Sequence, residues 1–259
     1  MTKHILLKRE GPLATIVLNR PEKLNALTKS MWQKLAETFV SLSRDDDLRC
    51  IIIRGAGGRA FSPGNDIKEF EKERNNVEAA RAYGTVMCET LRAIESCKHP
   101  VIAMIQGVCV GGGLEIASVC DLRICAESSR FGIPVNRLGL VMSLRELRGL
   151  ANLVGRAAAL EILLEGEIFG AARAREMGLV NRVVADDLLE QEVEKTAARI
   201  VKGAPLVARW HKQFINRLAD PTPLSEQEMD EGYACFGTED FQIGYRAFLE
   251  KTEPKFKGR

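Results

Sequence analysis

The sequence predicts an α/β fold that continues into a helical C-terminal region. Short apolar segments alternate with amphipathic segments of helix length over roughly residues 1–185. Cys50–Arg54 and Val101–Ile105 are nearly all apolar, which is typical of strands covered on both faces. After Asp186 the pattern is wholly helical. Together these observations favour a layered core followed by a helical extension.

The first half of the chain alternates strands with long helices. Leu13–Leu18 is apolar and β-branched, which predicts a strand, and Asn19–Glu22 forms a turn. Thr28 can cap a helix that runs to about Ser43. Further segments follow in order: strand 50–54, a glycine-rich stretch 55–64, helix 75–97 and strand 101–105.

The second half begins with a second glycine-rich turn, Gly107–Gly113. Pro205 fits the first turn of a later helix, where a missing N–H costs nothing. The predicted elements are helix 114–119, strands 121–126 and 130–132, helix 147–164, strand 179–184, and helices 187–202, 205–218, 225–235 and 240–250.

Composition excludes several classes of protein. Hydrophobic residues make up 46% and charged residues 28%, as in ordinary globular proteins, which excludes a disordered or collagen-like chain. No apolar run has the roughly 20 residues that a membrane span needs. The net charge of +2 argues against nucleic acid as a partner, although it leaves room for a local basic pocket.

The cysteines and the N-terminal residues bear on the cellular compartment, and the histidines bear on metal binding. The seven cysteines lack CxxC spacing and lie mostly in apolar stretches, so we expect reduced, buried thiols in a cytoplasmic protein. Three scattered histidines predict no zinc-type cluster. Residues 1–11 are polar and charged and lack the apolar core of a signal peptide.

Two glycine-rich turns are the first candidates for a site. Gly55–Ala60 fits G-x-G-x-x-A, but Pro63 and Gly64 break the helix that a dinucleotide fold requires there. The turns at Ser62–Asp66 and Gly111–Glu115 each follow a strand and precede a helix. Glycine lets a backbone approach closely, so N–H groups from the two turns could form an oxyanion hole. Either turn alone could equally serve packing.

Several motifs in matching order carry a family resemblance over almost the whole chain. They are Leu18–Leu27, Ala60–Ile67, Lys98–Ala103, Gly107–Glu115, Cys120–Leu122, Phe131–Pro134, Leu138–Leu140, Leu153–Arg156 and Ala174–Asn181. As a set, they resemble the enoyl-CoA hydratase/isomerase (crotonase) superfamily. The resemblance implies a crotonase-type ββα spiral core at 1–200, a C-terminal helical region at 201–259, and a homotrimer or a hexamer made of two trimers.

The same resemblance implies a binding site for an acyl-CoA. Backbone N–H groups at Asn65 and Gly112 match the positions that polarise the thioester carbonyl, and many members have Ala where this chain has Asn65. Coenzyme A enters as part of the substrate, and no tightly bound cofactor or metal is implied. Its expected contacts are Lys23, Leu24, Ala26 and Lys68, with Phe248 and Lys251 from a neighbouring subunit. Each lysine could instead be an ordinary solvated charge.

Hydration of an enoyl thioester uses two carboxyl groups in the hydratases of this family, one as general base and one as general acid. The first matches Glu115, whose alternative role is to satisfy a helix N-terminus. The second position holds Val135, where hydratases carry Glu. A valine cannot move a proton, so the exact reaction depends on what compensates for it.

Three interpretations remain open. Glu115 could work alone with the oxyanion hole. Glu146 could reach the pocket, oriented by Arg145, and replace the missing group, although adjacent charges are usually solvated. The protein could also bind acyl-CoA without turnover. Our leading hypothesis is an enoyl-CoA hydratase or isomerase of fatty acid metabolism, and the alternatives are other enolate chemistry (isomerase, decarboxylase or thioesterase) and a non-catalytic acyl-CoA-binding protein.

Overall fold

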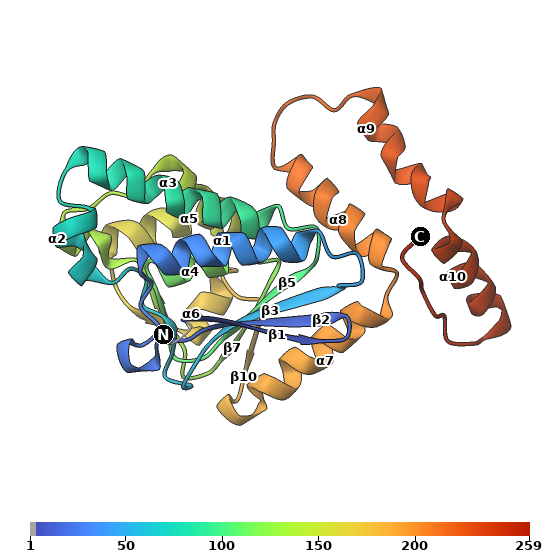
Figure 1. Ribbon diagram of the computed structural model, residues 1–259, viewed down its shortest axis with the longest axis horizontal. Helices are drawn as coiled ribbons and strands as arrows, with labels where there is room; N and C mark the ends of the chain where they lie inside the picture. Colours follow the sequence, from blue (N-terminus) through green and yellow to red (C-terminus); the bar gives the residue numbers. More distant parts are fainter. Residues whose placement is uncertain (1–3) are drawn as a thin grey trace.

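The computed structural model describes residues 4–259, and within them the larger sheet has six strands (Figure 1). The first three residues of the polar N-terminal segment lie outside the described part. β1 pairs antiparallel with β2, and every other neighbour in this sheet is parallel. The spatial order is β1 (Ile5–Glu10), β2 (Leu13–Leu18), β3 (Cys50–Gly55), β5 (Val101–Ile105), β7 (Leu122–Ala126) and β10 (Arg182–Val184).

A smaller sheet takes one short strand after each central strand of the larger sheet. Its order is β4 (Ala60–Ser62), β6 (Val108–Val110), β8 (Arg130–Gly132) and β9 (Phe169–Gly170). Each turn of the chain therefore contains a strand in the larger sheet, a strand in the smaller sheet and then a helix. This repeat confirms the predicted α/β fold with ββα turns.

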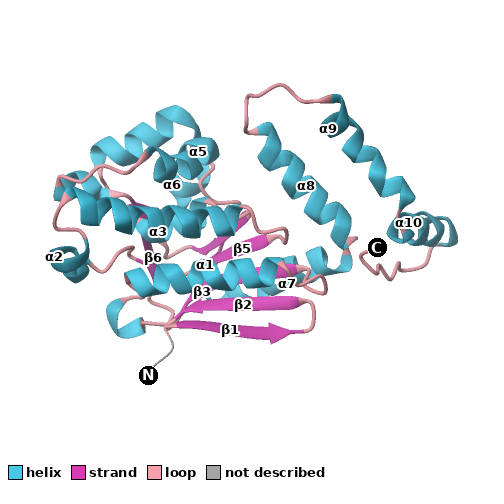
Figure 2. Cartoon of the chain, turned by 45° about the horizontal axis from the view of Figure 1, so that its top comes forward, coloured by secondary structure: helices cyan, strands magenta, loops and turns pink. Residues whose placement is uncertain are grey.

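Helices cover both faces of the larger sheet. α1, α3 and α5 lie over one face, with Ile51 and Ile53 of β3 in their core, while α7 packs against Cys50 and Ile52 on the other face (Figure 2). This double cover explains why β3 is apolar at consecutive positions. The helices are α1 (Lys29–Ser43), α2 (Phe70–Glu73), α3 (Val77–Glu95), α4 (Gly112–Ser118), α5 (Leu144–Glu165), α6 (Ala171–Glu176), α7 (Leu189–Lys202), α8 (Pro205–Leu218), α9 (Glu226–Asp230) and α10 (Glu239–Glu250).

The long helices lie where the sequence predicts them, and the shortest elements do not appear in the prediction. β4, β6 and β9 have two or three residues each and lie within or beside turns. β1 is an edge strand whose exposed side chains include charged ones, and α2 and α6 are also too short for a periodic pattern to show.

Two predicted boundaries are wrong. The strand predicted at 179–184 begins only at Arg182, because the Leu179 N–H bonds back to the Ala174 carbonyl at the end of α6. The helix predicted at 225–235 ends at Asp230 and continues as 3₁₀ turns over Glu231–Gly237.

α8, α9 and α10 lie to one side of the sheets (Figure 1). An ion pair connects α8 to the larger sheet. Lys212 Nζ lies 2.8 Å from Asp121 Oδ2 and 3.0 Å from the His99 carbonyl oxygen. The same Asp121 oxygen accepts the Val101 N–H. Burial raises the pKa of Asp121, and the Lys212 charge opposes that shift. α8 is thus joined to the start of β5 through a nearly enclosed ion pair.

The two glycine-rich turns predicted from the sequence lie directly against each other. A Cβ atom at Gly64 would stand 2.6 Å from the Gly112 nitrogen, and Gly64 has a φ of +95°. A Cβ atom at Gly113 would stand 2.2 Å from the Ser62 carbonyl oxygen. Backbone contact at these distances requires glycine, so packing fixes the relative position of the turns.

Three further observations concern the described residues 4–259. None of their helices is long and apolar enough to cross a membrane. No group of three or more His, Cys, Asp or Glu side chains in this range could hold a metal ion. The cysteines are all free thiols, and most of them are buried.

The contact between the turns can be tested with a pair of helical glycines. Alanine in place of a helical glycine that has room for a Cβ stabilises by about 0.5–1 kcal/mol, which we expect for Gly84→Ala, where a Cβ meets nothing within 4 Å. Gly113→Ala should instead destabilise by about 1–3 kcal/mol, because its Cβ collides with the Ser62 carbonyl. Urea unfolding of both variants checks this, and equal stabilisation by the two would contradict the contact.

Candidate active site

A cavity of about 390 Å³ lies between the two glycine turns and the start of α5. It brings together the predicted residues Ala26, Asn65, Gly112, Glu115 and Glu146 with Val135. Its remaining wall is mostly apolar and consists of Pro63, Asp66, Ile67, Phe70, Arg74, Val110, Gly111, Pro134, Leu138, Leu140 and Met142. Convergent polar groups in an apolar cavity are the usual signature of a small-molecule site.

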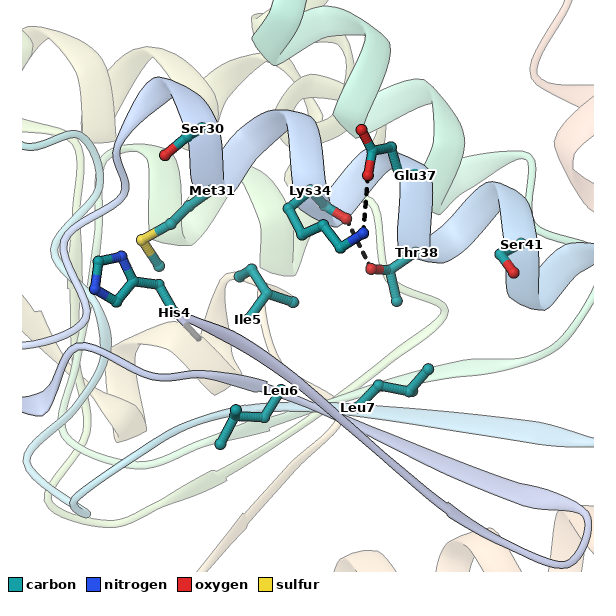
Figure 3. A pocket seen from close by; sticks show the side chains of 10 residues that line it. All are labelled: His4, Ile5, Leu6, Leu7, Ser30, Met31, Lys34, Glu37, Thr38 and Ser41. Atoms are coloured by element: carbon teal, nitrogen blue, oxygen red, sulfur yellow. Dashed lines mark hydrogen bonds and ion pairs between the residues drawn. The ribbon is translucent and has the colours of Figure 1, made fainter. Parts of the chain in front are cut away.

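A larger cavity of about 710 Å³ lies elsewhere, between β1 and α1 (Figure 3). Its wall contains His4, Leu6 and Met31, together with Lys34 and Glu37, which pair with each other on α1. None of the candidate catalytic residues lines it. We therefore take the cavity of about 390 Å³ as the candidate active site, because it contains the candidate catalytic residues and the larger cavity does not.

The turn at Lys23–Ala26 is held in a strained shape beside the candidate site. Leu24 and Asn25 have φ values of 53° and 64°. The buried Asn25 side chain stabilises this shape, since its Oδ1 accepts the Arg20 N–H and its Nδ2 donates to the Ala56 and Ala60 carbonyls. Ala26 thereby reaches the cavity wall.

Trp32 contacts both residues whose backbone N–H groups are predicted to form the oxyanion hole, Asn65 and Gly112. Its indole Nε1 donates to Asn65 Oδ1 at 2.7 Å. Its ring also lies against Gly112, where an added Cβ would come within 3.0 Å of it. The Asn65 side-chain oxygen is thus already engaged by the core residue Trp32, so the side chain is not needed for substrate binding. One fully buried tryptophan therefore fixes two backbone positions of the cavity wall.

The backbone N–H groups at these positions are available for a ligand. Neighbours on either side of Asn65 bond to Leu27, since Leu27 N donates to Gly64 O and Asp66 N donates to Leu27 O. This parallel bridge leaves the Asn65 N–H directed elsewhere. Gly112 is the first residue of α4, where helix geometry provides no intrahelical acceptor for the N–H group.

Glu115 lies one turn into α4 and is 6% exposed. No described residue donates a hydrogen bond to its buried Oε2. Burial, and to a lesser extent the charge of Glu146, raise the pKa of Glu115 to about 8, while the charge of Arg74 acts in the opposite direction. Glu115 therefore holds a proton at neutral pH, which suits a group that gives and takes protons.

Val135 lies on the same cavity wall, in the 3₁₀ turn Pro134–Leu138. Its side chain is half-buried and packs against the main core. The position that carries Glu in hydratases of the family is therefore inside the cavity, and it is apolar in this chain. Any second proton-transfer group would have to come from another element.

Glu146 enters the cavity from the start of α5 and is 8% exposed, so it is not a solvated surface charge. Ser143 orients it through a capping box, in which the Ser143 N–H donates to Glu146 Oε2 at 2.7 Å. The expectation that Arg145 orients it is wrong, because Arg145 is exposed and no hydrogen bond joins the two side chains. The structure thus supplies a second buried carboxylate beside Glu115.

The predicted coenzyme A contacts fall into two groups. Lys23 and Leu24 adjoin Ala26 in the strained turn, and the exposed Lys68 follows Asp66 of the cavity wall. Phe248 lies on α10 and Lys251 directly follows it, and α10 is on the opposite side of the molecule from α2 (Figure 1). Within one chain, Ala26 lines the cavity, the other members of the first group are close to its wall residues in sequence, and the second group lines no part of it.

Two charged residues of the cavity wall have no counterpart in the sequence prediction. Asp66 is paired with Arg20 at 3.0 Å, and this pair ties the Lys23–Ala26 turn to the first glycine turn. Arg74 follows the short helix α2 and faces the same cavity as Glu115. Asp66 lies within the Ala60–Ile67 motif without being singled out there, and Arg74 belongs to no recognisable motif.

Comparison with known proteins agrees with this fold. A sequence model of the family described as "Enoyl-CoA hydratase/isomerase" matches residues 8–259. A short-chain-enoyl-CoA hydratase from Clostridium acetobutylicum is 34% identical, over 99% of this chain and 98% of its own length. A crotonyl-CoA hydratase from Syntrophomonas wolfei is also 34% identical, over 98% of both.

Solved structures also resemble this chain over almost its whole length. The crystal structure of an enoyl-CoA hydratase/carnithine racemase from Magnetospirillum magneticum has a TM-score of 0.98 and 50% identity, and the match covers 100% of this chain and 97% of that chain. The chain belongs to the enoyl-CoA hydratase/isomerase family. It is an acyl-CoA-transforming enzyme of the crotonase superfamily, as the sequence predicts.

The proton on Glu115 can be detected through stability. The folded protein holds this proton more tightly than the unfolded chain, because burial raises the pKa of Glu115 to about 8. The contribution to stability is present below the unfolded pKa of about 4.3 and is lost as pH rises through about 8. Relative to Glu115→Gln, the wild type should lose on the order of a few kcal/mol of unfolding free energy between pH 5 and pH 8.5.

Urea unfolding of both proteins across this pH range measures the difference directly. Glutamine has nearly the same volume as glutamate and cannot ionise, so only the charge differs. A difference in unfolding free energy that stays constant from pH 5 to pH 8.5 would contradict the raised pKa.

Proposed function

We propose that this enzyme adds water across the C2=C3 double bond of an enoyl-CoA thioester. The proposal rests on one observation: two buried carboxylates, Glu115 and Glu146, line the same cavity as the backbone at Asn65 and Gly112. The printed names of the relatives, which are hydratases, support the same reaction.

The thioester carbonyl oxygen would accept hydrogen bonds from the Asn65 and Gly112 N–H groups. Attack of water at C3 moves charge onto this oxygen, so donors fixed in advance stabilise the resulting enolate more than the substrate. Trp32 and the contact between the turns hold both groups in place before substrate arrives. Removal of one such donor typically costs roughly 10²–10³ in rate.

The two carboxylates divide the proton transfers between them. Glu146 Oε1 would accept a proton from water while its Oε2 keeps the Ser143 N–H bond. The hydroxide so formed bonds to C3. Glu115 is protonated at neutral pH and delivers its proton to C2, which gives the 3-hydroxyacyl thioester. Exchange with solvent then returns a proton to Glu115 and removes one from Glu146.

Val135 is the reason to assign Glu146 a role. With Val135 in place of the usual Glu, the cavity contains no other acidic group without a partner, since Asp66 is engaged by Arg20. This arrangement favours two-carboxylate hydration over catalysis by Glu115 alone. A binding protein without turnover has less support, because it gives no reason for two carboxylates to be buried together.

Coenzyme A would enter past the Lys23–Ala26 turn as part of the substrate. Lys23 belongs to this turn, and the exposed Lys68 is close in sequence to Asp66 of the cavity wall. Both lysines could meet the phosphates of coenzyme A. No tightly bound cofactor is needed for the steps above. A cytoplasmic location stays a prediction, which the free cysteines support.

We also propose that three copies assemble, either alone or as a dimer of trimers, with the C-terminal helices at the contact. Large apolar side chains are exposed there, with Phe248 84% and Leu249 69% exposed on α10. An apolar patch of this kind is typical of an interface. Phe248 and Lys251 would then meet coenzyme A bound to a neighbouring copy.

Sedimentation velocity tests the assembly. We expect the wild type to sediment as a trimer or hexamer. Phe248→Glu combined with Leu249→Glu should shift it toward the monomer, since charge at an apolar contact is costly. A wild type that sediments as a 28.7 kDa monomer would contradict the proposal.

Turnover of crotonyl-CoA tests the catalytic assignment. Glu115→Gln should lower kcat by roughly 10²–10⁴, the usual contribution of a general acid or base. Glu146→Gln should lower it by roughly 10² or more while it preserves the fold, because Gln also completes a capping box. The decay of enoyl thioester absorbance measures both rates, and product analysis separates hydration from double-bond shift, decarboxylation and hydrolysis.

Glu165→Gln is the matched control, since Glu165 is an exposed glutamate at the other end of α5. We expect its kcat to equal that of the wild type. Activity of Glu146→Gln equal to this control would show that Glu115 works alone. Binding of acyl-CoA with no turnover of any thioester would support the non-catalytic alternative.

A further inference from the structure

Arg74 presents a positive charge to the acyl cavity. It directly follows α2, and it lies on the cavity wall with Phe70, Val135 and Glu146. Its guanidinium carbon stands 4.7 Å from the Phe70 ring centroid and 5.2 Å from the Tyr83 ring centroid. Two aromatic faces therefore hold the half-buried guanidinium in place and leave its N–H edge free to bond.

The guanidinium has no ion-pair or hydrogen-bond partner among residues 4–259. Three nearby acidic residues bond to other groups: Asp66 to Arg20, Glu69 to the Lys29 N–H, and Glu73 to Lys29 Nζ. The exposed Glu71 of α2 forms no ion pair with Arg74. No ion pair links Arg74 to Glu115 or Glu146 on the same cavity wall. A partly desolvated cation that is positioned but unpaired is costly unless a ligand supplies the counter-charge.

The chemistry of that counter-charge follows from the shape of guanidinium. Its planar N–H fork matches a carboxylate through two parallel hydrogen bonds. A carboxylate on the acyl chain would otherwise be repelled by Glu146 in this cavity, and Arg74 offsets that repulsion. An acyl chain that ends in a methyl group would leave the guanidinium unpaired.

We propose that the preferred substrate is an acyl-CoA whose acyl chain ends in a second carboxylate, and that Arg74 binds this carboxylate. The inference rests on the proposed function, because it assigns a substrate class to the same cavity. In the reaction, water adds across C2=C3 of an unsaturated dicarboxylic mono-thioester, with hydroxyl at C3 and hydrogen at C2, and the distal carboxylate is unchanged.

Binding of two saturated ligands of equal chain length tests this without any turnover. Glutaryl-CoA and pentanoyl-CoA differ only in a terminal carboxylate or methyl group. By titration calorimetry, we expect the wild type to bind glutaryl-CoA about 10- to 100-fold more tightly, as a charge-assisted pair provides. Equal binding, or tighter binding of pentanoyl-CoA, would overturn the proposal, and this comparison needs no variant.

The variant Arg74→Met should lose about 10- to 100-fold in affinity for glutaryl-CoA while its affinity for pentanoyl-CoA stays within about 3-fold. Lys72→Met is the matched control, because Lys72 is an exposed cation two residues away and does not line the cavity. It should bind both ligands as the wild type does. An equal loss for both ligands in Arg74→Met would show that Arg74 only maintains the cavity, which contradicts the proposal.

Turnover separates failure of this inference from failure of the proposed function. We expect kcat/KM to be higher for glutaconyl-CoA than for crotonyl-CoA, and Arg74→Met to remove that preference. A wild type that prefers crotonyl-CoA contradicts the substrate class and leaves the hydratase assignment standing. Tight glutaryl-CoA binding with no hydration of either enoyl thioester supports the substrate class and contradicts the hydratase.

Discussion

The backbone of the first glycine turn lies against the first residues of α4, and no side chain fits between them. Gly64 approaches the Gly112 nitrogen, and Gly113 approaches the Ser62 carbonyl. Everything in the cavity depends on this contact, since it places Asn65 and Gly112 side by side and sends Glu115 inward from the next turn of α4. Arg123 holds the other end of α4 by donating to the Ala117 and Cys120 carbonyls, so the helix cannot shift.

Glu146, the second carboxylate of the cavity, also has a structural role at the start of α5. Glu146 completes the capping box of α5 with Ser143, a pattern that occurs at many helix starts and has no catalytic meaning by itself. Here the loop before α5 brings that cap to the cavity wall, opposite an apolar Val135. One side chain thus stabilises a helix end and also lines the cavity, where its charge helps to raise the pKa of Glu115.

Much of this could be predicted from sequence, for physical reasons that differ between residues. The long helices and buried strands follow from periodicity, and Glu115, Asn65 and Gly112 follow from motifs whose glycines have a steric purpose. Of the smaller sheet only β8 is predicted, as the strand 130–132, because β4, β6 and β9 have two or three residues within or beside turns. Arg74 could not be predicted either, since its meaning comes from Phe70 and Tyr83 around it and from neighbours that pair elsewhere.

Trp32 touches both oxyanion positions, and this gives the protein a built-in optical probe. Its indole bonds to Asn65 and packs against Gly112, so its fluorescence responds to the hydrogen bonding and polarity of the two turns together. The chain has only one other tryptophan, Trp210, which lies on α8 among the C-terminal helices. With Trp210 replaced by phenylalanine, emission from a single buried indole would follow events at the cavity without any added label.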